Sequence, residues 1–163
     1  MNLSVGPNLI LSGLFSPDAV VMSLRAQDRD GVLSELLDKI PGLAKTPEAR
    51  HALLDALVAR EELFSTAQGN GVALPHTRNT IASLAGRTIV VFGRHPKGII
   101  YAPTDLTPVQ LYFLLLAPTV SRHLQALSRL SRLLRQSEFR QNLLIAATAE
   151  EVIGFVREAE EKM

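Results

Sequence analysis

Residues 69–76 read G-N-G-V-A-L-P-H, and this stretch joins a turn, a short strand and a histidine. The two glycines and the asparagine between them can adopt positive φ and so form a tight turn. The apolar residues Val72–Leu74 predict a buried strand, which Pro75 ends because proline has no N–H to donate. His76 therefore follows a strand end on a rigid base, a position at which α/β proteins usually present reactive side chains.

Strand-like runs alternate with helical patterns on both sides of this stretch. Further strands are predicted at Val20–Leu24, Thr88–Phe92 and Val109–Leu116. Helices are predicted at residues 30–40, 47–63, 121–144 and from 148 onward, and residues 1–17 are expected to form an irregular arm or short helix. Because the strand-like runs are apolar throughout, both faces of their sheet should be covered. The expected fold class is α/β, a three-layer sandwich of a mixed β-sheet flanked by helices, in one domain over residues 1–163.

Three of the predicted helices carry start signals. Thr46-Pro47 predicts an N-cap followed by proline at the first helical position, where the missing N–H has no cost. Ser121 is expected to cap a long helix that runs to residue 144, and T-x-x-E at 148–151 is the pattern of a capping box. The side chains expected to face inward are Leu124, Leu127, Leu130 and Leu134 from the long helix and Val152, Ile153 and Val156 from the last one.

The composition is that of an ordinary folded protein. Of 163 residues, 47% are apolar and 20% charged, the formal net charge is +1, and there is no cysteine. The small net charge gives no drive toward nucleic acid or a membrane, and the lack of cysteine excludes disulfides and thiolate chemistry. The longest apolar run, 111–117, is far shorter than the roughly 20 residues of a membrane helix, and residues 1–24 lack the Lys and Arg of a signal peptide. We expect a cytoplasmic, soluble protein without membrane insertion.

Histidine at the end of the short strand has the chemistry of a phosphoryl acceptor. Its ordinary pKa of ~6.5 leaves much of the ring neutral at cytoplasmic pH, so that a ring nitrogen is available to attack phosphorus. The phosphoryl group that results carries a charge approaching about −2 and needs a cation beside it. Arginine suits this role because its planar guanidinium matches the phosphate oxygens.

The chain resembles the type-2 IIA domains of the phosphotransferase system, the fructose, mannitol and nitrogen-regulatory family. The resemblance rests on an ordered set of segments: R-E-E-L-F-S-T at 60–66, G-N-G-V-A-L-P-H at 69–76, F-G-R-H-P-K-G-I at 92–99, V-Q-L-Y-F-L-L-L-A-P at 109–118, R-H-L-Q-A-L-S-R-L-S-R-L-L-R at 122–135 and S-E-F-R-Q-N-L-L at 137–144. Because these segments span nearly the whole chain, the resemblance implies the mannitol/fructose-type IIA fold.

The resemblance also implies roles for three residues. His76 matches the histidine that takes phosphate from phospho-HPr or an HPr-like carrier, Arg60 the arginine near the phosphohistidine, and His123 a second histidine that assists transfer. No cofactor is implied. For His123 the local pattern agrees, because free N–H groups and the helix dipole favour an anion in the first turn after Ser121. A purely structural ion pair of Arg60 with Glu61 or Glu62 is the alternative to its phosphate role.

Two functions follow from the resemblance. The domain either relays phosphate to a cysteine on a sugar-specific IIB domain, or it is a regulatory module whose phosphorylation controls its affinity for target proteins. The G-N-G turn and a free-standing chain resemble the nitrogen-regulatory branch more. Thr77 departs from the family, which usually has glycine or alanine there, and its hydroxyl could bind phosphate or its methyl could crowd the carrier.

The other histidines and the C-terminal arginines have simpler interpretations. His51 is expected to be solvated, and His95, in R-H-P-K-G, to lie in a turn. No two histidines have metal-ligand spacing and no acidic cluster accompanies them, so no metal site is expected. The arginines at 122, 129, 132, 135 and 140 interleave with leucines and lack stacking aromatics, which predicts a solvated helix face and not a nucleic-acid surface. Contact of this face with an acidic partner stays open.

Overall fold

A mixed, five-stranded sheet lies at the centre of the protein, in the order β1-β4-β5-β3-β2. The computed structural model describes residues 9–77 and 86–163. Its strands are β1 (Val20–Val21), β2 (Ala67–Gly69), β3 (Val72–Ala73), β4 (Ile89–Ile99) and β5 (Val109–Leu116). The long strands β4 and β5 pair antiparallel, whereas β1 joins β4 and β3 joins β5 in parallel.

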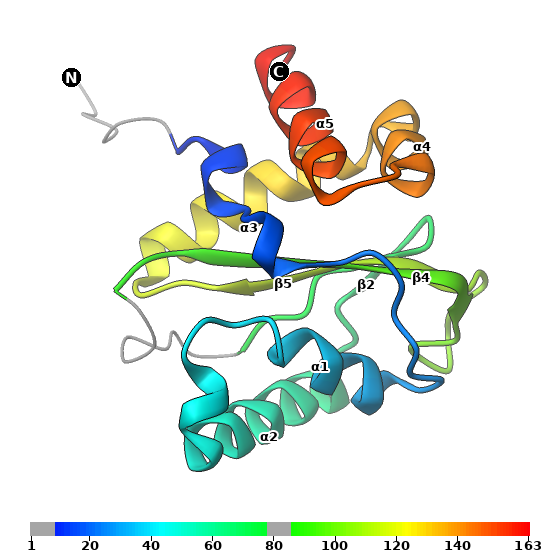
Figure 1. Cartoon of the computed structure of the whole chain (residues 1–163). Coiled ribbons are helices and arrows are strands. Elements are labelled where there is room, and N and C mark those ends of the chain that lie inside the picture. The colour runs from blue at the N-terminus through cyan, green and yellow to red at the C-terminus, as the bar shows by residue number, and fades with distance from the viewer. Residues whose placement is uncertain (1–8, 78–85) are drawn as a thin grey trace, which may run out of the picture.

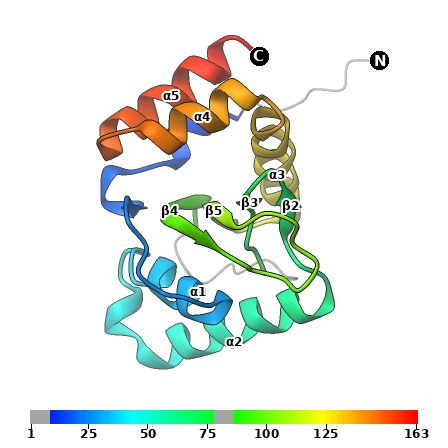
Figure 2. The same cartoon turned by 90° about the vertical axis from the view of Figure 1, so that its right-hand side faces the viewer.

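Helices cover both faces of this sheet, as Figures 1 and 2 show from two directions. One layer holds α1 (Arg29–Leu37) and α2 (Pro47–Leu63), and the other holds α3 (Val120–Leu134), α4 (Ser137–Ile145) and α5 (Ala149–Glu161). Short 3-10 helices, η1 (Leu11–Leu14), η2 (Pro17–Ala19) and η3 (Leu43–Lys45), lie in the connections. The predicted α/β sandwich of three layers is confirmed.

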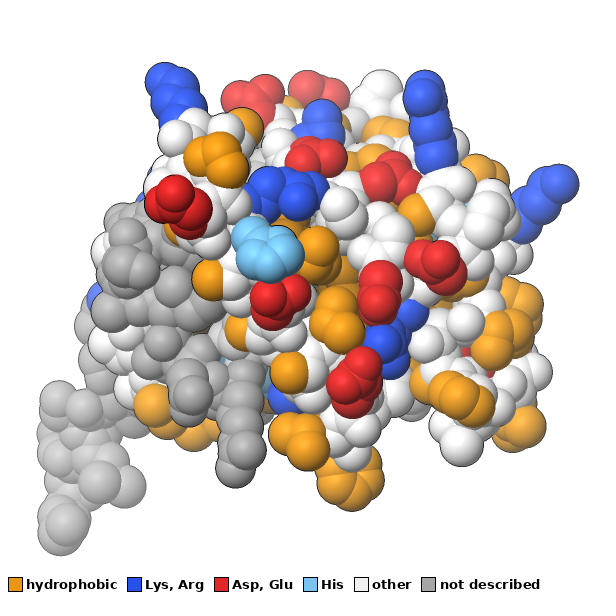
Figure 3. Space-filling model, turned by 90° about the horizontal axis from the view of Figure 1, so that it is seen from below, with side chains coloured by type: hydrophobic (Ala, Val, Ile, Leu, Met, Phe, Trp, Pro, Cys, Tyr) orange, Lys and Arg blue, Asp and Glu red, His pale blue; other side chains and the backbone are white. Residues whose placement is uncertain are grey.

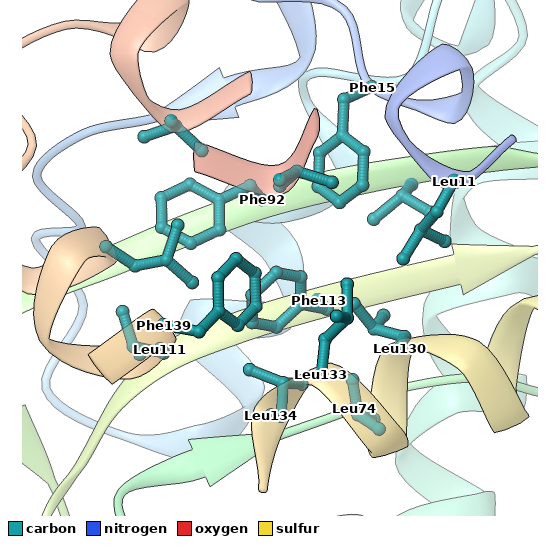
Figure 4. Close-up of a cluster of buried hydrophobic side chains, with 14 of the residues drawn as sticks. Leu11, Phe15, Leu74, Phe92, Leu111, Phe113, Leu130, Leu133, Leu134 and Phe139 are labelled. Carbon is teal, nitrogen blue, oxygen red and sulfur yellow. The ribbon is translucent and has the colours of Figure 1, made fainter. Parts of the chain in front are cut away.

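The core has two halves, one on each face of β4 and β5. Alternate residues of a strand point to opposite faces, so Phe92 and Phe113 pack toward α3, α4 and α5 while Val91 and Leu114 pack toward α1 and α2. Figure 4 shows the first half, in which the Phe113 ring lies edge-on to Phe92 and to Phe15, with ring centroids 5.2 and 6.3 Å apart. The continuous apolar runs of these strands are explained by this burial on both faces.

The helix predicted at 121–144 is in fact two helices, and this prediction was wrong. Gln136 has an extended backbone (φ −81°, ψ 117°), and the Arg140 side chain donates to the Leu134 carbonyl at 2.7 Å, so α3 ends before α4 begins. The N-cap is Thr119 and not Ser121, since the Thr119 hydroxyl accepts the N–H of Arg122 at 3.2 Å. The face that α3 turns to the core contains Ala126, Leu130 and Leu133, so Leu124, predicted to face inward, is exposed and Leu127 is partly buried. Leu130 and Leu134 are buried as predicted.

The starts of α5 and α2 agree better with the residues predicted to cap them. Thr148 and Glu151 form the capping box expected at the start of α5. Thr46 is the N-cap of α2 and Pro47 its first residue, but the Thr46 hydroxyl contacts the Gly42 carbonyl at 3.4 Å instead of a free helix N–H.

His95 lies inside a strand and not in a turn, which is a second correction. β4 continues through R-H-P-K-G to Ile99, where Gly98 takes a positive φ of 75° and the pairing with β5 shifts register. Such an irregularity lets a strand carry residues that would otherwise end it. The His95 ring is only 3% exposed; its Nε2 contacts the Ala26 carbonyl at 2.9 Å and its Nδ1 accepts the Gly98 N–H at 3.0 Å.

The N-terminal segment is partly built into the fold. Of the predicted arm, residues 1–8 lie outside the described residues, and the rest forms η1 and η2. The N–H groups of Leu11 and Ser12 donate to the carboxylate of Glu160 at the end of α5. The predicted strand at 20–24 is shorter than expected, although the Leu24 N–H still donates to the Arg94 carbonyl at 2.8 Å.

The face formed by α1 and α2 carries acidic, basic and hydrophobic side chains in mixture (Figure 3). Ion pairs such as Arg50 with Asp38, 2.8 Å apart, account for part of this pattern. Among residues 9–77 and 86–163, no helix has the length and apolar character that a membrane span requires.

Gly93 permits the close packing of α1 against β4. A Cβ at this position would lie 2.6 Å from Leu36 Cδ2 and 3.0 Å from Leu24 Cδ1. We expect Gly93→Ala to lower the free energy of unfolding by about 1–3 kcal/mol, because the core would be overpacked. The matched control is Gly154→Ala in α5, where an added Cβ meets nothing within 4 Å and should stabilise the helix by about 0.5–1 kcal/mol. Urea unfolding followed by circular dichroism measures both, and a Gly93→Ala protein as stable as the wild type would contradict this packing.

Candidate functional site

His76 lies just beyond β3, on a segment held by hydrogen bonds from both sides. The G-N-G turn forms as predicted, with positive φ at Gly69, Asn70 and Gly71. It reverses the chain between β2 and β3, a strand pair that the sequence did not reveal because Ala67–Gly69 has no apolar pattern. Beyond β3, the Pro75 carbonyl still accepts the Leu115 N–H at 2.9 Å. Proline thus removes one donor from the ladder, but the backbone that carries His76 stays attached to β5.

A single hydrogen bond determines which nitrogen of His76 is available for chemistry. Nδ1 lies 2.7 Å from the carbonyl oxygen of Leu74. A carbonyl can only accept, so Nδ1 carries the hydrogen and Nε2 keeps its lone pair in the neutral ring. Burial lowers the pKa of His76, the Leu74 carbonyl acts in the opposite direction, and the positive charge of Arg60 lowers the pKa further. At neutral pH the ring is therefore uncharged, with a nucleophilic Nε2.

His123 lies in the first turns of α3 and contacts His76 directly. The two ring centroids are 5.0 Å apart with an interplanar angle of 56°. Burial lowers the pKa of His123, and repulsion between the two rings when both are protonated lowers it further. The backbone N–H of His123 donates to the Thr119 carbonyl at 3.0 Å, so it is not one of the free helix-start donors that the sequence argument assumed.

Arg60 lies in the last turn of α2 and is close enough for its charge to act on His76. Its guanidinium donates to the Phe64 carbonyl. Within residues 9–77 and 86–163 it forms no ion pair with Glu61 or Glu62, whose partners are Thr66 and Arg29 respectively. The structure therefore brings Arg60, His76 and His123 to one place.

Two buried polar residues next to the candidate site, Glu61 and Thr66, were not predicted from the sequence to belong to it. The carboxylate of Glu61 accepts hydrogen bonds from the N–H and the hydroxyl of Thr66. A signal was present in the spacing, since Leu53, Leu57 and Glu61 follow at intervals of four and all three are buried. The pattern marked Glu61 as an inward-facing carboxylate, but not what it binds.

Apolar side chains are exposed on the same helix ends that carry Arg60 and His123. Phe64, at the end of α2, is 79% exposed, and Leu63 beside it is also exposed. Val120 and Leu124 are exposed on the first turns of α3. Thr77 is buried, so its methyl presents little surface to an approaching protein.

The remaining sequence predictions concern residues away from this site. His51 is exposed as predicted and lies 3.4 Å from Asp55. The solvated arginine face is only partly correct, because Arg129 pairs with Glu160 at 3.4 Å and Arg140 caps α3. In the part of the chain that the structure describes, no three or more His, Cys, Asp or Glu side chains gather as a metal would require.

This fold, with a histidine at a strand end, is that of a phosphotransferase-system component. Residues 13–159 match the family model described as "Phosphoenolpyruvate-dependent sugar phosphotransferase system, EIIA 2", and the chain belongs to this family. The resemblance drawn from its motifs is confirmed.

Relatives of two kinds are similar to the chain. A nitrogen regulatory protein from Bradyrhizobium diazoefficiens is 33% identical over 87% of this chain and 91% of its own length. The fructose-specific EIIABC component of Bacillus subtilis is 30% identical over 91% of this chain, which spans only 23% of that longer protein. The crystal structure of nitrogen regulatory protein IIA-Ntr from Neisseria meningitidis superposes with a TM-score of 0.78 at 26% identity, covering 90% of this chain and 98% of the other.

The electrostatics of the site predict the direction in which His76 responds to loss of a neighbouring charge. We expect Arg60→Gln to raise the pKa of His76, because one of the causes that lower it is removed while burial remains. Long-range ¹H–¹⁵N spectra recorded across a pH titration measure this pKa directly. Acceptance of phosphate by the neutral ring should then decline at a higher pH in the variant than in the wild type. Arg157→Gln, on the exposed side of α5, is the charge-matched control, and equal His76 pKa values in both variants would contradict an influence of Arg60.

Proposed function

We propose that this protein is a phosphoryl carrier that accepts phosphate on Nε2 of His76 from phospho-HPr or an HPr-like carrier. The observation that carries the proposal is the 2.7 Å contact between His76 Nδ1 and the Leu74 carbonyl, which leaves Nε2 as the nucleophile. In the transfer, the Nε2 lone pair forms a bond to phosphorus while the bond between phosphorus and the donor carrier breaks. His76 keeps its proton on Nδ1, and the donor leaves with the electron pair of the broken bond.

Arg60 and His123 have the chemistry to stabilise the phosphoryl group after transfer. Arg60 is a permanent cation, whereas the lowered pKa keeps His123 neutral in the unphosphorylated protein. A phosphoryl group on His76 would place negative charge beside His123, so that His123 gains affinity for a proton. His123 would then donate to a phosphate oxygen when phosphate is present and release that proton after it has left.

The exposed apolar side chains around the site suit the docking of a protein donor. Leu63 and Phe64 lie on the α2 side, and Val120 and Leu124 lie on the α3 side. Large apolar side chains that are exposed together usually mark an interaction surface. Docking there would bring a phosphorylated carrier to His76 and exclude water from the transfer.

We propose regulation as the principal role, with phosphorylation of His76 controlling binding to target proteins. The likeness to the nitrogen regulatory proteins of Bradyrhizobium diazoefficiens and Neisseria meningitidis supports this role. The alternative is sugar transport, in which phosphate passes on to a IIB domain of a fructose/mannitol-type permease, and the fructose-specific Bacillus subtilis relative favours it. In either role residues 1–163 act as one IIA domain, in the cytoplasm. Transfer of label from the phosphorylated protein to a purified IIB domain would favour transport, whereas phosphate that stays on His76 would favour regulation.

The central test is phosphate acceptance. With enzyme I, HPr and labelled phosphoenolpyruvate, we expect the wild type to be labelled and His76→Ala to remain folded but unlabelled. His51→Ala is the matched control, because His51 is an exposed histidine away from the site and its loss should leave labelling unchanged. If His76→Ala took up label as fast as the wild type, the acceptor would be another residue.

Replacement of His123 should separate acceptance from onward transfer. His123→Ala retains the nucleophile, so we expect phosphate still to load onto His76. Return of label to HPr should slow, or hydrolysis of the phosphohistidine should change, because the group is less well held for in-line transfer. Both rates are measured on the isolated, labelled protein. Rates equal to the wild type, with an intact circular dichroism spectrum, would remove His123 from the site.

A further inference from the structure

Glu61 is buried on the inner side of α2, and its hydrogen bonds place the chain that follows the helix. The residue is only 5% exposed. One carboxylate oxygen accepts the Thr66 N–H at 2.8 Å and the other accepts the Thr66 hydroxyl. A buried carboxylate is unfavourable unless its oxygens are hydrogen-bonded, so Thr66 is held in one position beneath the end of α2.

Thr66 in turn connects to the residue that orients His76. The Thr66 carbonyl accepts the Leu74 N–H at 3.1 Å, and the Leu74 carbonyl accepts from Nδ1 of His76 at 2.7 Å. Thr66 and Leu74 are both buried, so water does not compete for these bonds. A continuous series of hydrogen bonds therefore runs from the Glu61 carboxylate through Thr66 and Leu74 to the His76 ring.

Glu61 also fixes the short connection after α2, residues 64–66, which Arg60 contacts from the same helix. Arg60 donates to the Phe64 carbonyl, and Glu61 accepts from Thr66. Successive residues of α2 thus hold the two ends of one short connection. Movement of this connection would displace the guanidinium and the imidazole together.

From this connectivity we infer that Glu61 is a positioning residue for His76, which acts through Thr66 and Leu74 to keep Nε2 unprotonated and directed to the surface. The inference rests on the proposed role of His76 as phosphoryl acceptor. Its neighbour Glu62 offers a contrast, because that side chain is 67% exposed and lies 3.8 Å from Arg29.

Other ionisable groups face this series of bonds. The Tyr101 hydroxyl and Arg29 lie near Glu61, while Arg60 and His123 lie near His76. Burial, and then the charge of Glu61, raise the pKa of Tyr101, so it remains a neutral phenol in the working range. Its oxygen is buried without a hydrogen bond of normal geometry among the described residues. The Tyr101 hydroxyl thus lies beside two members of this series, Glu61 and Thr66, whereas Arg29 is affected by Glu61 through its charge alone.

Replacement of Glu61 can affect His76 in two ways, which shift the His76 pKa in opposite directions. It can displace the Leu74 carbonyl, or it can simply loosen the fold around the ring. The Leu74 carbonyl favours the protonated ring, so its displacement should lower the His76 pKa further. Local unfolding would instead admit water, relieve the larger effect of burial and raise the pKa toward ~6.5. The sign of the change therefore distinguishes positioning from loosening, and Thr66→Val, which keeps the Glu61 charge, separates positioning from the direct effect of that charge.

The experiment compares Glu61→Gln and Glu61→Ala with Glu62→Gln, using ring ¹⁵N spectra of His76 and the rate of labelling by phospho-HPr. We expect a lowered His76 pKa, a mixture of ring tautomers and a loss of labelling rate of about 10- to 100-fold for Glu61→Ala, as displacement of a reacting group allows. Glu61→Gln can still accept the Thr66 N–H and should show a smaller change in the same direction. Glu62→Gln should match the wild type.

A second pair of variants keeps the test decisive if Glu61→Ala does not fold. Thr66→Val removes the hydroxyl and retains the N–H and the volume, whereas Thr66→Ser retains the hydroxyl. We expect the pKa change with Thr66→Val and wild-type behaviour with Thr66→Ser. An unchanged or raised His76 pKa in the folded Glu61 or Thr66→Val variants would overturn the inference. A wild type that accepts no phosphate would refute the proposed function, while the pKa and tautomer comparison would still judge Glu61 by itself.

Discussion

The antiparallel pairing of β4 with β5 is the constraint on which the rest of the structure depends. These two strands are apolar on both faces, so neither can be solvated and helices must cover each side. The two halves of the core are built on their alternate residues, with Phe92 and Phe113 on one face and Val91 and Leu114 on the other. β1 and β3 pair directly with these strands, and α1, α3 and α4 contact them from the two faces.

The candidate site owes its geometry to the β5 edge of that pair, where β3 joins the sheet. β3 joins β5 in parallel for only Val72 and Ala73, and the chain then stays attached through the Pro75 carbonyl as it leaves the sheet. A short strand on a long, rigid one holds the backbone in place while the next side chain turns outward. The backbone of His76 is therefore held by the sheet while its side chain is still partly exposed, as the proposed transfer from a second protein requires.

Burial and polarity act together at this edge. Partial burial keeps His76 and His123 neutral, and a neutral ring is needed for attack on phosphorus. The Leu74 carbonyl determines which nitrogen keeps its lone pair for the proposed attack, because it can be satisfied only by an N–H. The buried pair of Glu61 and Thr66 is connected to the same residue, because the Thr66 carbonyl accepts the Leu74 N–H. These directional hydrogen bonds define the position of the loop, which apolar packing alone would not.

The sequence by itself determined the fold class and proposed His76 as the centre of the candidate site. Continuous apolar runs indicate a covered sheet, and the G-N-G turn, the short strand and Pro75 place His76 at a strand end, because these are local properties of the chain. The family resemblance added Arg60 and His123. Sequence patterns failed where contacts between distant residues override local preference. His95 lies in a strand because β4 continues past it to pair again with β5 at Ile99. The division of the helix at 121–144 is a local effect that the apolar pattern does not reveal, because the backbone of Gln136 is extended and Arg140 donates to the Leu134 carbonyl.

Only the tertiary structure decided how the site residues act. The tautomer of His76 depends on a carbonyl two residues away whose direction is set by Thr66, and Thr66 is held by a carboxylate on another element. The spacing of Glu61 with Leu53 and Leu57 already favours it over Glu62 as the buried carboxylate, but its partner Thr66 is known only from the fold. Hydrogen bonds of this kind join residues that are close only after folding. Their geometry therefore cannot be obtained from the spacing of residues along the chain.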